Sequence, residues 1–107
     1  MSSRQVSTAR REIILEEQKE SLNKSEEVAE ALLLEIQSLV SICDRFIVLI
    51  RESPEPQTFL RRIDALLEIC EELYNVRELH RFHNSQISLF KERIKTTQEL
   101  MRLFPGY

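Results

Sequence analysis

Apolar residues recur every seven positions along the first half of the chain. This row consists of Leu15, Leu22, Ala29, Ile36, Cys43 and Ile50. A companion row on the same face is polar at Arg11 and becomes apolar from Leu32 onward. Alternating steps of three and four residues place both rows on one face of an α-helix. The pattern therefore predicts one long helix over residues 5–52, or two helices with a restart near Asn23.

The second half of the chain carries the same seven-residue repeat. Its members are Phe59, Leu66, Leu73, His80, Ile87 and Ile94. The repeat ends at Phe104-Pro105-Gly106, which is a typical helix-stop signal. We expect a second helix over residues 57–104, and a break near Asn84 would divide it into two.

A turn at residues 53–56 separates the two repeats. Its sequence is Ser-Pro-Glu-Pro, in which Ser53 is a candidate N-cap and Pro54 suits the first helical position. Matching the two rows about this turn places Cys43 opposite Leu66. We therefore predict an all-α fold with a single helical domain over residues 1–107. It is an antiparallel hairpin of two long, coiled-coil-like helices, with residues 1–10 mobile.

The half of the hairpin near the turn contains more apolar residues than a two-helix seam needs, which is about two positions in seven. The additional residues flank the two rows: Val28, Leu33, Val40, Ile42, Ile47, Leu49, Leu60, Leu67, Ile69 and Tyr74. Exposing all of them would create an unusually large apolar patch for a monomer. We expect a third helix of the same chain or helices of another chain to cover them and complete a bundle.

The composition favours long helices and a protein partner. Of the 107 residues 31% are charged and only one is glycine, as is typical of helical proteins. The net charge of −3 does not favour nucleic-acid binding, which needs a basic surface. Glu35, Asp44 and Arg45 interrupt the most apolar window, so no transmembrane segment is expected. The first ten residues lack the apolar core of a signal peptide, which suggests an intracellular protein, cytoplasmic or nuclear.

No set of residues in the sequence indicates catalysis. The only glycine is Gly106, so no glycine-rich phosphate loop is present. His80, His83 and Cys70 could approach a zinc ion but lack a fourth ligand. The two cysteines lie in apolar stretches, where a thiol is inert. We therefore expect no enzyme, no cofactor, no metal site and no small-molecule substrate.

In its general pattern the chain resembles the small helical subunits of multi-protein assemblies. This implies a non-catalytic scaffold subunit that packs against helical partner chains in a hetero- or homo-oligomer. The stretch from Arg61 to Tyr74, with the basic residues after Val76, is loosely similar to a three-helix co-chaperone domain. That likeness implies the alternative function, a monomeric adaptor module that binds a folded protein partner.

Overall fold

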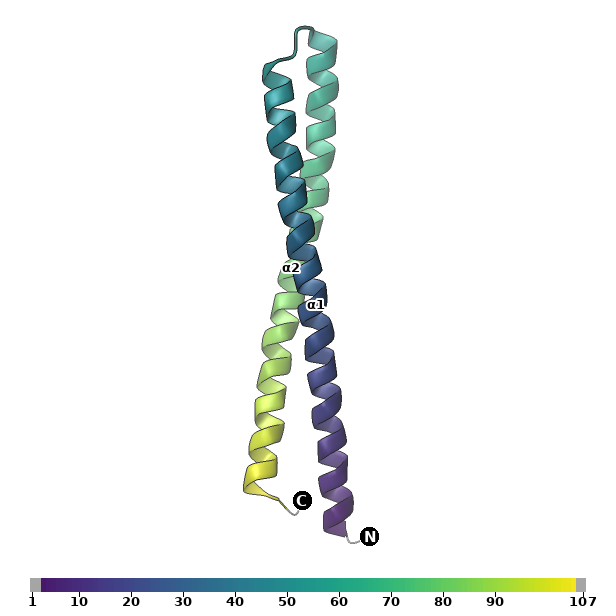
Figure 1. The fold of residues 1–107 in the computed structure, drawn as a ribbon, viewed down its shortest axis with the longest axis vertical. Helices are drawn as coiled ribbons and strands as arrows, with labels where there is room; N and C mark the ends of the chain where they lie inside the picture. Colours follow the sequence, from purple (N-terminus) through teal and green to yellow (C-terminus); the bar gives the residue numbers. More distant parts are fainter. Residues whose placement is uncertain (1–2, 106–107) are drawn as a thin grey trace. The chain divides into compact units, whose positions relative to one another are not determined.

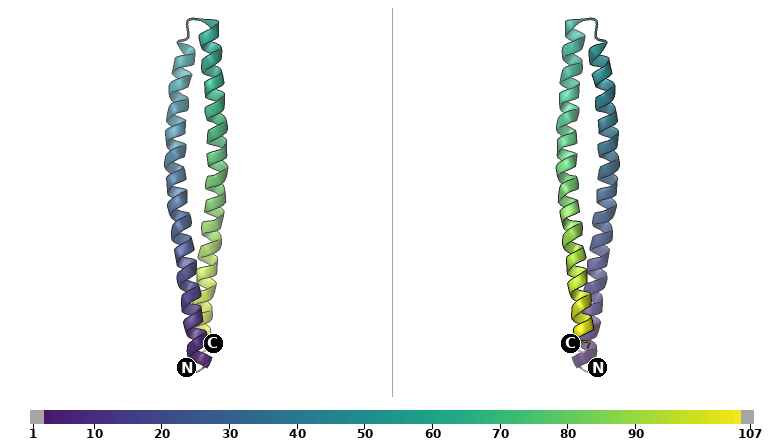
Figure 2. Two further views of the ribbon diagram at one scale, coloured as in Figure 1. Left: turned by 90° about the vertical axis from the view of Figure 1, so that its right-hand side faces the viewer. Right: turned by 90° about the vertical axis from the view of Figure 1, so that its left-hand side faces the viewer.

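The chain forms two helices in a computed structural model that describes the backbone of residues 3–105 and the side chains of residues 8–105. Helix α1 spans Ser3–Arg51 and helix α2 spans Pro56–Leu103. They run antiparallel and are joined by one short loop (Figure 1, Figure 2). The predicted all-α antiparallel hairpin of two long helices is confirmed. Neither Asn23 nor Asn84 interrupts a helix, so the described residues contain two helices rather than three.

The hairpin divides into two compact units, which are described separately. The loop unit is Ala29–Phe82 and contains the end of α1, the loop and the start of α2. The terminal unit is the described part of Met1–Val28 and His83–Tyr107. Within each unit one segment of α1 lies beside one segment of α2 (Figure 1, Figure 2).

Burial follows the heptad repeat along both helices. We letter the Leu15 row of α1 and the Phe59 row of α2 as position a. Position d is the row that includes Leu32 in α1 and Ile69 in α2. The a positions from Leu15 to Ile50 and from Leu66 to Ile94 are all buried or half-buried, whereas Phe59 is exposed. The repeat therefore identifies the inward face of each helix.

The buried core is nevertheless small. Among the described residues it consists of Ala29, Leu32 and Leu39, all on α1 in the loop unit. No described residue of α2 is buried. Two helices alone cover each other along a narrow stripe, and much of each helix surface stays in contact with water.

The register of the two helices differs from the predicted one by about one helical turn. Cys43 of α1 has Cys70 of α2 as a close neighbour, so its predicted position opposite Leu66 is wrong. Position a of α1 thus lies level with position d of α2, where Ile69 precedes Cys70. The prediction matched a with a because that pairing placed apolar residues opposite each other near the turn.

The terminal unit is closed by contacts between the start of α1 and the end of α2. Thr8 Oγ1 donates a hydrogen bond to the carbonyl oxygen of Pro105 at 3.3 Å. Arg11 Nη1 donates to the carbonyl oxygen of Phe104 at 2.7 Å. The carbonyl groups at the end of a helix have no intrahelical donors, and these side chains supply them.

The loop ends α1 in a way that the sequence pattern did not predict. Ser53 Oγ donates to the carbonyl oxygen of Leu49 at 2.9 Å, so it caps the end of α1 instead of the start of α2. Helix α2 begins at Pro56, which replaces Pro54 as the proline at the first helical position. Arg62 Nη1 reaches back to Ser53 Oγ at 2.9 Å and also donates to the Leu49 carbonyl oxygen.

Candidate interaction surface

The predicted partner-contacting residues lie mostly on the outside of the hairpin. Those classed as exposed are Val28, Leu33, Ile47, Leu49, Leu60, Leu67 and Tyr74. Val40, Ile42 and Ile69 are half-buried. Val28 belongs to the terminal unit and the others to the loop unit. The loop unit therefore exposes large apolar side chains that its own two helices do not cover.

Ile69 has a different position from the one that we predicted. It lies seven residues before Val76, which places it at position d of α2 and on the inward face. Both residues are half-buried, as the neighbouring a positions are. The signal was present in the sequence, because extending the companion row of the second helix backward from Val76 leads directly to Ile69.

Six apolar side chains form two parallel rows on one side of the loop unit. We call them the apolar stripe: Leu33, Val40 and Ile47 at position e of α1, and Leu60, Leu67 and Tyr74 at position b of α2. On a helix, positions e and b follow position a on the same side. The stripe is on the side where Cys43, at position a, meets Cys70 and Arg77, both at position e of α2. Leu60, Leu67 and Tyr74 are each about 60% exposed.

Sequence reasoning missed several exposed apolar residues of the loop unit. Leu34 and Val48 lie at position f of α1, which points directly away from the seam, and they are 61% and 51% exposed. Leu79 and Phe82 of α2 are also exposed. Leu34, Val48 and Phe82 are too far from the inward rows to be identified by a search for flanking positions, whereas Leu79 is at the flanking position g and was overlooked. A count of apolar residues on every helical face would have found them.

Acidic side chains border the apolar stripe on both sides. We call them the acidic edges: Glu30 and Asp44 at position b of α1, and Asp64, Glu71 and Glu78 at position f of α2. The loop unit contains ten Asp and Glu against six Lys and Arg, a net charge of −4. Among these edge residues, Glu78 forms an ion pair with Arg81 at 2.6 Å. Exposed pairs of this kind contribute only ~0–1 kcal/mol, so the edges remain available to interact with other charges.

The fold changes the acidity of the Cys43 thiol. Burial raises its pKa most, and the neighbouring Cys70 and Asp44 raise it further, while Arg77 lowers it. A raised pKa keeps the thiol protonated at neutral pH, and a protonated thiol is a poor nucleophile. The arrangement at Cys43 therefore favours packing over covalent chemistry.

The two histidines occupy inward positions and are half-buried. His80 is at position a in the loop unit, and His83 is at position d in the terminal unit. In the part of the chain that the structure describes, no group of three or more His, Cys, Asp or Glu side chains is arranged to hold a metal ion.

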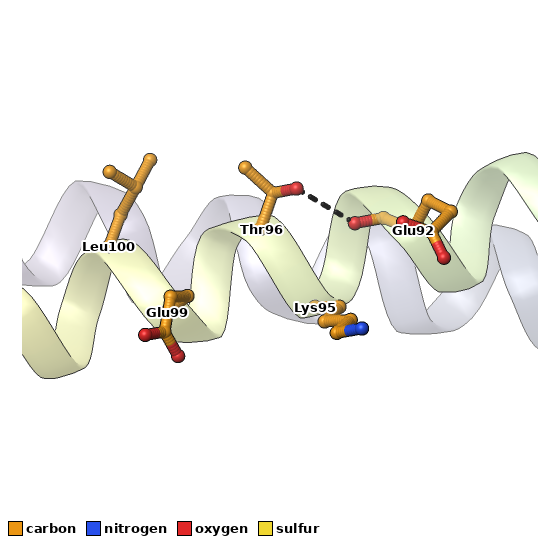
Figure 3. Close-up of a pocket in the computed structure, with 5 residues that line it drawn as sticks. All are labelled: Glu92, Lys95, Thr96, Glu99 and Leu100. Carbon is orange, nitrogen blue, oxygen red and sulfur yellow. Dashed lines mark hydrogen bonds between the residues drawn. The ribbon is translucent and has the colours of Figure 1, made fainter.

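A shallow groove lies on the outer surface of α2 in the terminal unit. It is lined by Glu92, Lys95, Thr96, Glu99 and Leu100, all from consecutive turns of one helix (Figure 3). Thr96 Oγ1 donates to the carbonyl oxygen of Glu92 at 3.0 Å, and Glu99 forms an ion pair with Arg102. Thr96 and Glu99 are thus engaged within the helix, and the groove is the ordinary space between neighbouring helical side chains.

Neither helix has, within residues 3–105, an apolar stretch of the length needed to cross a membrane. No protein-family model, no curated protein and no solved structure matches the chain. Its function must therefore be inferred from its own residues.

Proposed function

We propose that the chain is a non-catalytic structural subunit that assembles through helical packing with partner helices. The observation that carries this proposal is the imbalance of the loop unit. It buries only Ala29, Leu32 and Leu39 among the described residues, while it exposes the larger part of the apolar stripe. Removing apolar surface from water provides ~25 cal/mol per Å², so the exposed rows favour association with another helix.

The distribution of charge supports assembly over catalysis. A binding surface for protein is commonly an apolar centre with a polar rim, and the loop unit has both. A half-buried, protonated Cys43 and an open groove on one helix provide no activated group that would transform a substrate. The proposed role is therefore structural: the hairpin contributes two helices to a larger bundle.

Light scattering coupled to size exclusion, with circular dichroism, tests this proposal on the full chain over a range of concentrations. We expect the chain alone either to self-associate above 12.7 kDa or to bind a hydrophobic dye and unfold with low cooperativity. The proposal would be contradicted if the chain were a compact, fully helical monomer at all concentrations. Such a monomer would also unfold cooperatively and bind no dye.

The variant Leu33→Glu with Val40→Glu tests whether the apolar stripe is the contact. Both residues lie on α1, seven positions apart, and charging them places two carboxylates in the stripe without touching the buried core. We expect assembly or dye binding to be lost while helicity is kept. The matched control is Ala31→Glu with Ser38→Glu, two exposed positions with the same spacing on another face of α1. Assembly of the stripe variant at wild-type affinity would place the interface elsewhere.

The alternative function, a monomeric adaptor that recognises a folded partner through charged side chains, makes the opposite prediction. Arg77 and Arg81 are exposed on α2, and reversing them to Glu should then weaken partner binding more than the stripe variant does. For a scaffold subunit the stripe variant has the larger effect, because the apolar contact supplies most of the affinity.

A further inference from the structure

We infer that the apolar stripe binds an amphipathic helix of a second, different chain, whose apolar row is bordered by lysine and arginine. This inference rests on the proposed function and specifies the chemistry of the partner. The apolar stripe determines that the partner is a helix, and the acidic edges determine the charge beside its apolar row.

The spacing of the stripe fits one long helical ligand. Leu33, Val40 and Ile47 repeat every seven residues along α1, and the α2 row from Leu60 to Tyr74 has the same repeat. Each row spans two heptads, or about 21 Å at a rise of 1.5 Å per residue. Two such rows side by side form the surface onto which an amphipathic helix of about four turns or more packs its own apolar residues.

The charge around the stripe distinguishes a different chain from a second copy. Glu30 and Asp44 border it along α1, while Asp64, Glu71 and Glu78 border it along α2. Two copies that met through this face would bring acidic edges together, and like charges at an interface oppose association. A partner with Lys or Arg beside its apolar row would pair with the same carboxylates. Three exposed arginines lie next to the stripe. Arg51 and Arg81 are near its two ends, and Arg77 is at position e of α2 on its inner side, so the two outer borders remain acidic.

The test uses two designed helical peptides as probes, because charge is then the only difference between them. Both have the same apolar row over three heptads, with Lys bordering it in one peptide and Glu in the other. Fluorescence anisotropy measures the binding of each labelled peptide to the full chain at low and high salt. We expect the Lys-bordered peptide to bind at least ten times more tightly at low salt, with the difference decreasing as salt screens the charges.

Two double variants show where on the chain the preference for the Lys-bordered peptide arises. Asp64→Lys with Glu71→Lys should reverse the preference between the peptides. Glu92→Lys with Glu99→Lys changes the net charge equally, at the same f position of the same helix, but in the terminal unit. It should leave the preference unchanged if binding occurs at the stripe. An equal change of the relative affinity for the two peptides in both double variants would show general attraction to an acidic chain. That result would overturn the assignment of the preference to the acidic edges.

The outcomes separate this inference from the proposed function. Equal binding of both peptides, lost in the Leu33→Glu with Val40→Glu variant, would overturn the basic partner and leave apolar assembly standing. A stable homodimer that the stripe variant disrupts would show that a second copy occupies the stripe, which overturns the inference alone. Failure of both peptides to bind a cooperatively folded monomer would overturn the inference and the proposed function together.

Discussion

The thiols of Cys43 and Cys70 are neighbours across the two helices of the loop unit. Both cysteines are free, one half-buried and the other exposed. This contact defines the register of α1 against α2 near the middle of the loop unit, and it is accessible to chemical measurement.

Oxidation by diamide, an azo compound, tests the register. The two thiols lose two protons and two electrons to the reagent, which is reduced to the hydrazine, and an S–S bond forms. We expect rapid intramolecular cross-linking of the reduced chain, because the thiols are already in contact. The cross-linked monomer should migrate faster on a non-reducing gel.

The control moves the second thiol to position 66, which the sequence pattern placed opposite Cys43. A chain with Leu66→Cys and Cys70→Ser should cross-link at least tenfold more slowly, because that position lies about one turn away from Cys43. Faster cross-linking in this variant than in the wild-type chain would support the originally predicted register instead.

The raised pKa of Cys43 predicts slow alkylation. The pKa lies above its ordinary value of 9.0, mainly because burial disfavours the thiolate. The rate at which iodoacetamide labels Cys43, followed by mass spectrometry of its peptide, should still be rising with pH at that value and should level off only above it. In denaturing urea the curve should return to the ordinary range, and an identical curve in both conditions would refute the shift.

The same pKa predicts how stability depends on pH. The folded state holds the proton of Cys43 more tightly than the unfolded state, so its contribution is complete below the ordinary pKa. That contribution is lost as pH increases through the raised value of the folded state. The urea midpoint should therefore fall in this alkaline range more for the wild-type chain than for Cys43→Val, which has no thiol to ionise.

Arg62 stabilises the loop by joining α2 to the end of α1. Its guanidinium donates to the Ser53 hydroxyl and to the Leu49 carbonyl oxygen, and the residue is half-buried. We expect Arg62→Ala to lower the free energy of unfolding by about 1 kcal/mol. For a chain of this size that is a decrease of ~4–8 °C in Tm.

Arg61→Ala is the matched control for the loop, because the neighbouring Arg61 is exposed and the substitution removes the same charge. Its Tm should remain within one or two degrees of the wild type. Equal decreases for both variants would indicate a general charge effect and not the loop contacts.

Gln18 marks a weak point in the terminal unit. It lies at position d, and its Oε1 atom is shielded from solvent without a hydrogen-bond partner among the described residues. Because a shielded polar atom without a partner costs free energy, Gln18→Leu should increase stability by about 1 kcal/mol. Urea unfolding measures this, and Gln37→Leu on the exposed surface should change stability much less.

The heptad pattern predicted which residues of each helix face inward. Only a narrow face of each helix is buried against the other, and residues on that face recur every seven positions. Leu22 and Ile87 illustrate this, since each is half-buried although both of its neighbours in sequence are polar. The pattern did not determine register, because shifting one row along another by a turn still pairs apolar residues. The Cys43–Cys70 contact therefore could not be predicted from the spacing alone.

The details of the loop depend on interactions that the local sequence leaves open. Ser53 could cap the start of one helix or the end of the other. It caps the end of α1, where its hydroxyl accepts a hydrogen bond from Arg62 of α2. The apolar stripe was predictable for the same reason as the inward rows. The charge of the proposed partner was not predictable. The acidic residues that border the stripe come from both helices, and they can be seen to flank it only when the two helices are placed side by side.

The division of the chain has a consequence for the order of folding during synthesis. All of the loop unit lies within residues 29–82, so its contacts close short loops and are available once that stretch has left the ribosome. The terminal unit joins segments from both ends, and its Thr8–Pro105 contact spans 97 residues. The start of α1 is therefore made first but finds its helical neighbour last, and until then a chaperone has access to its apolar residues.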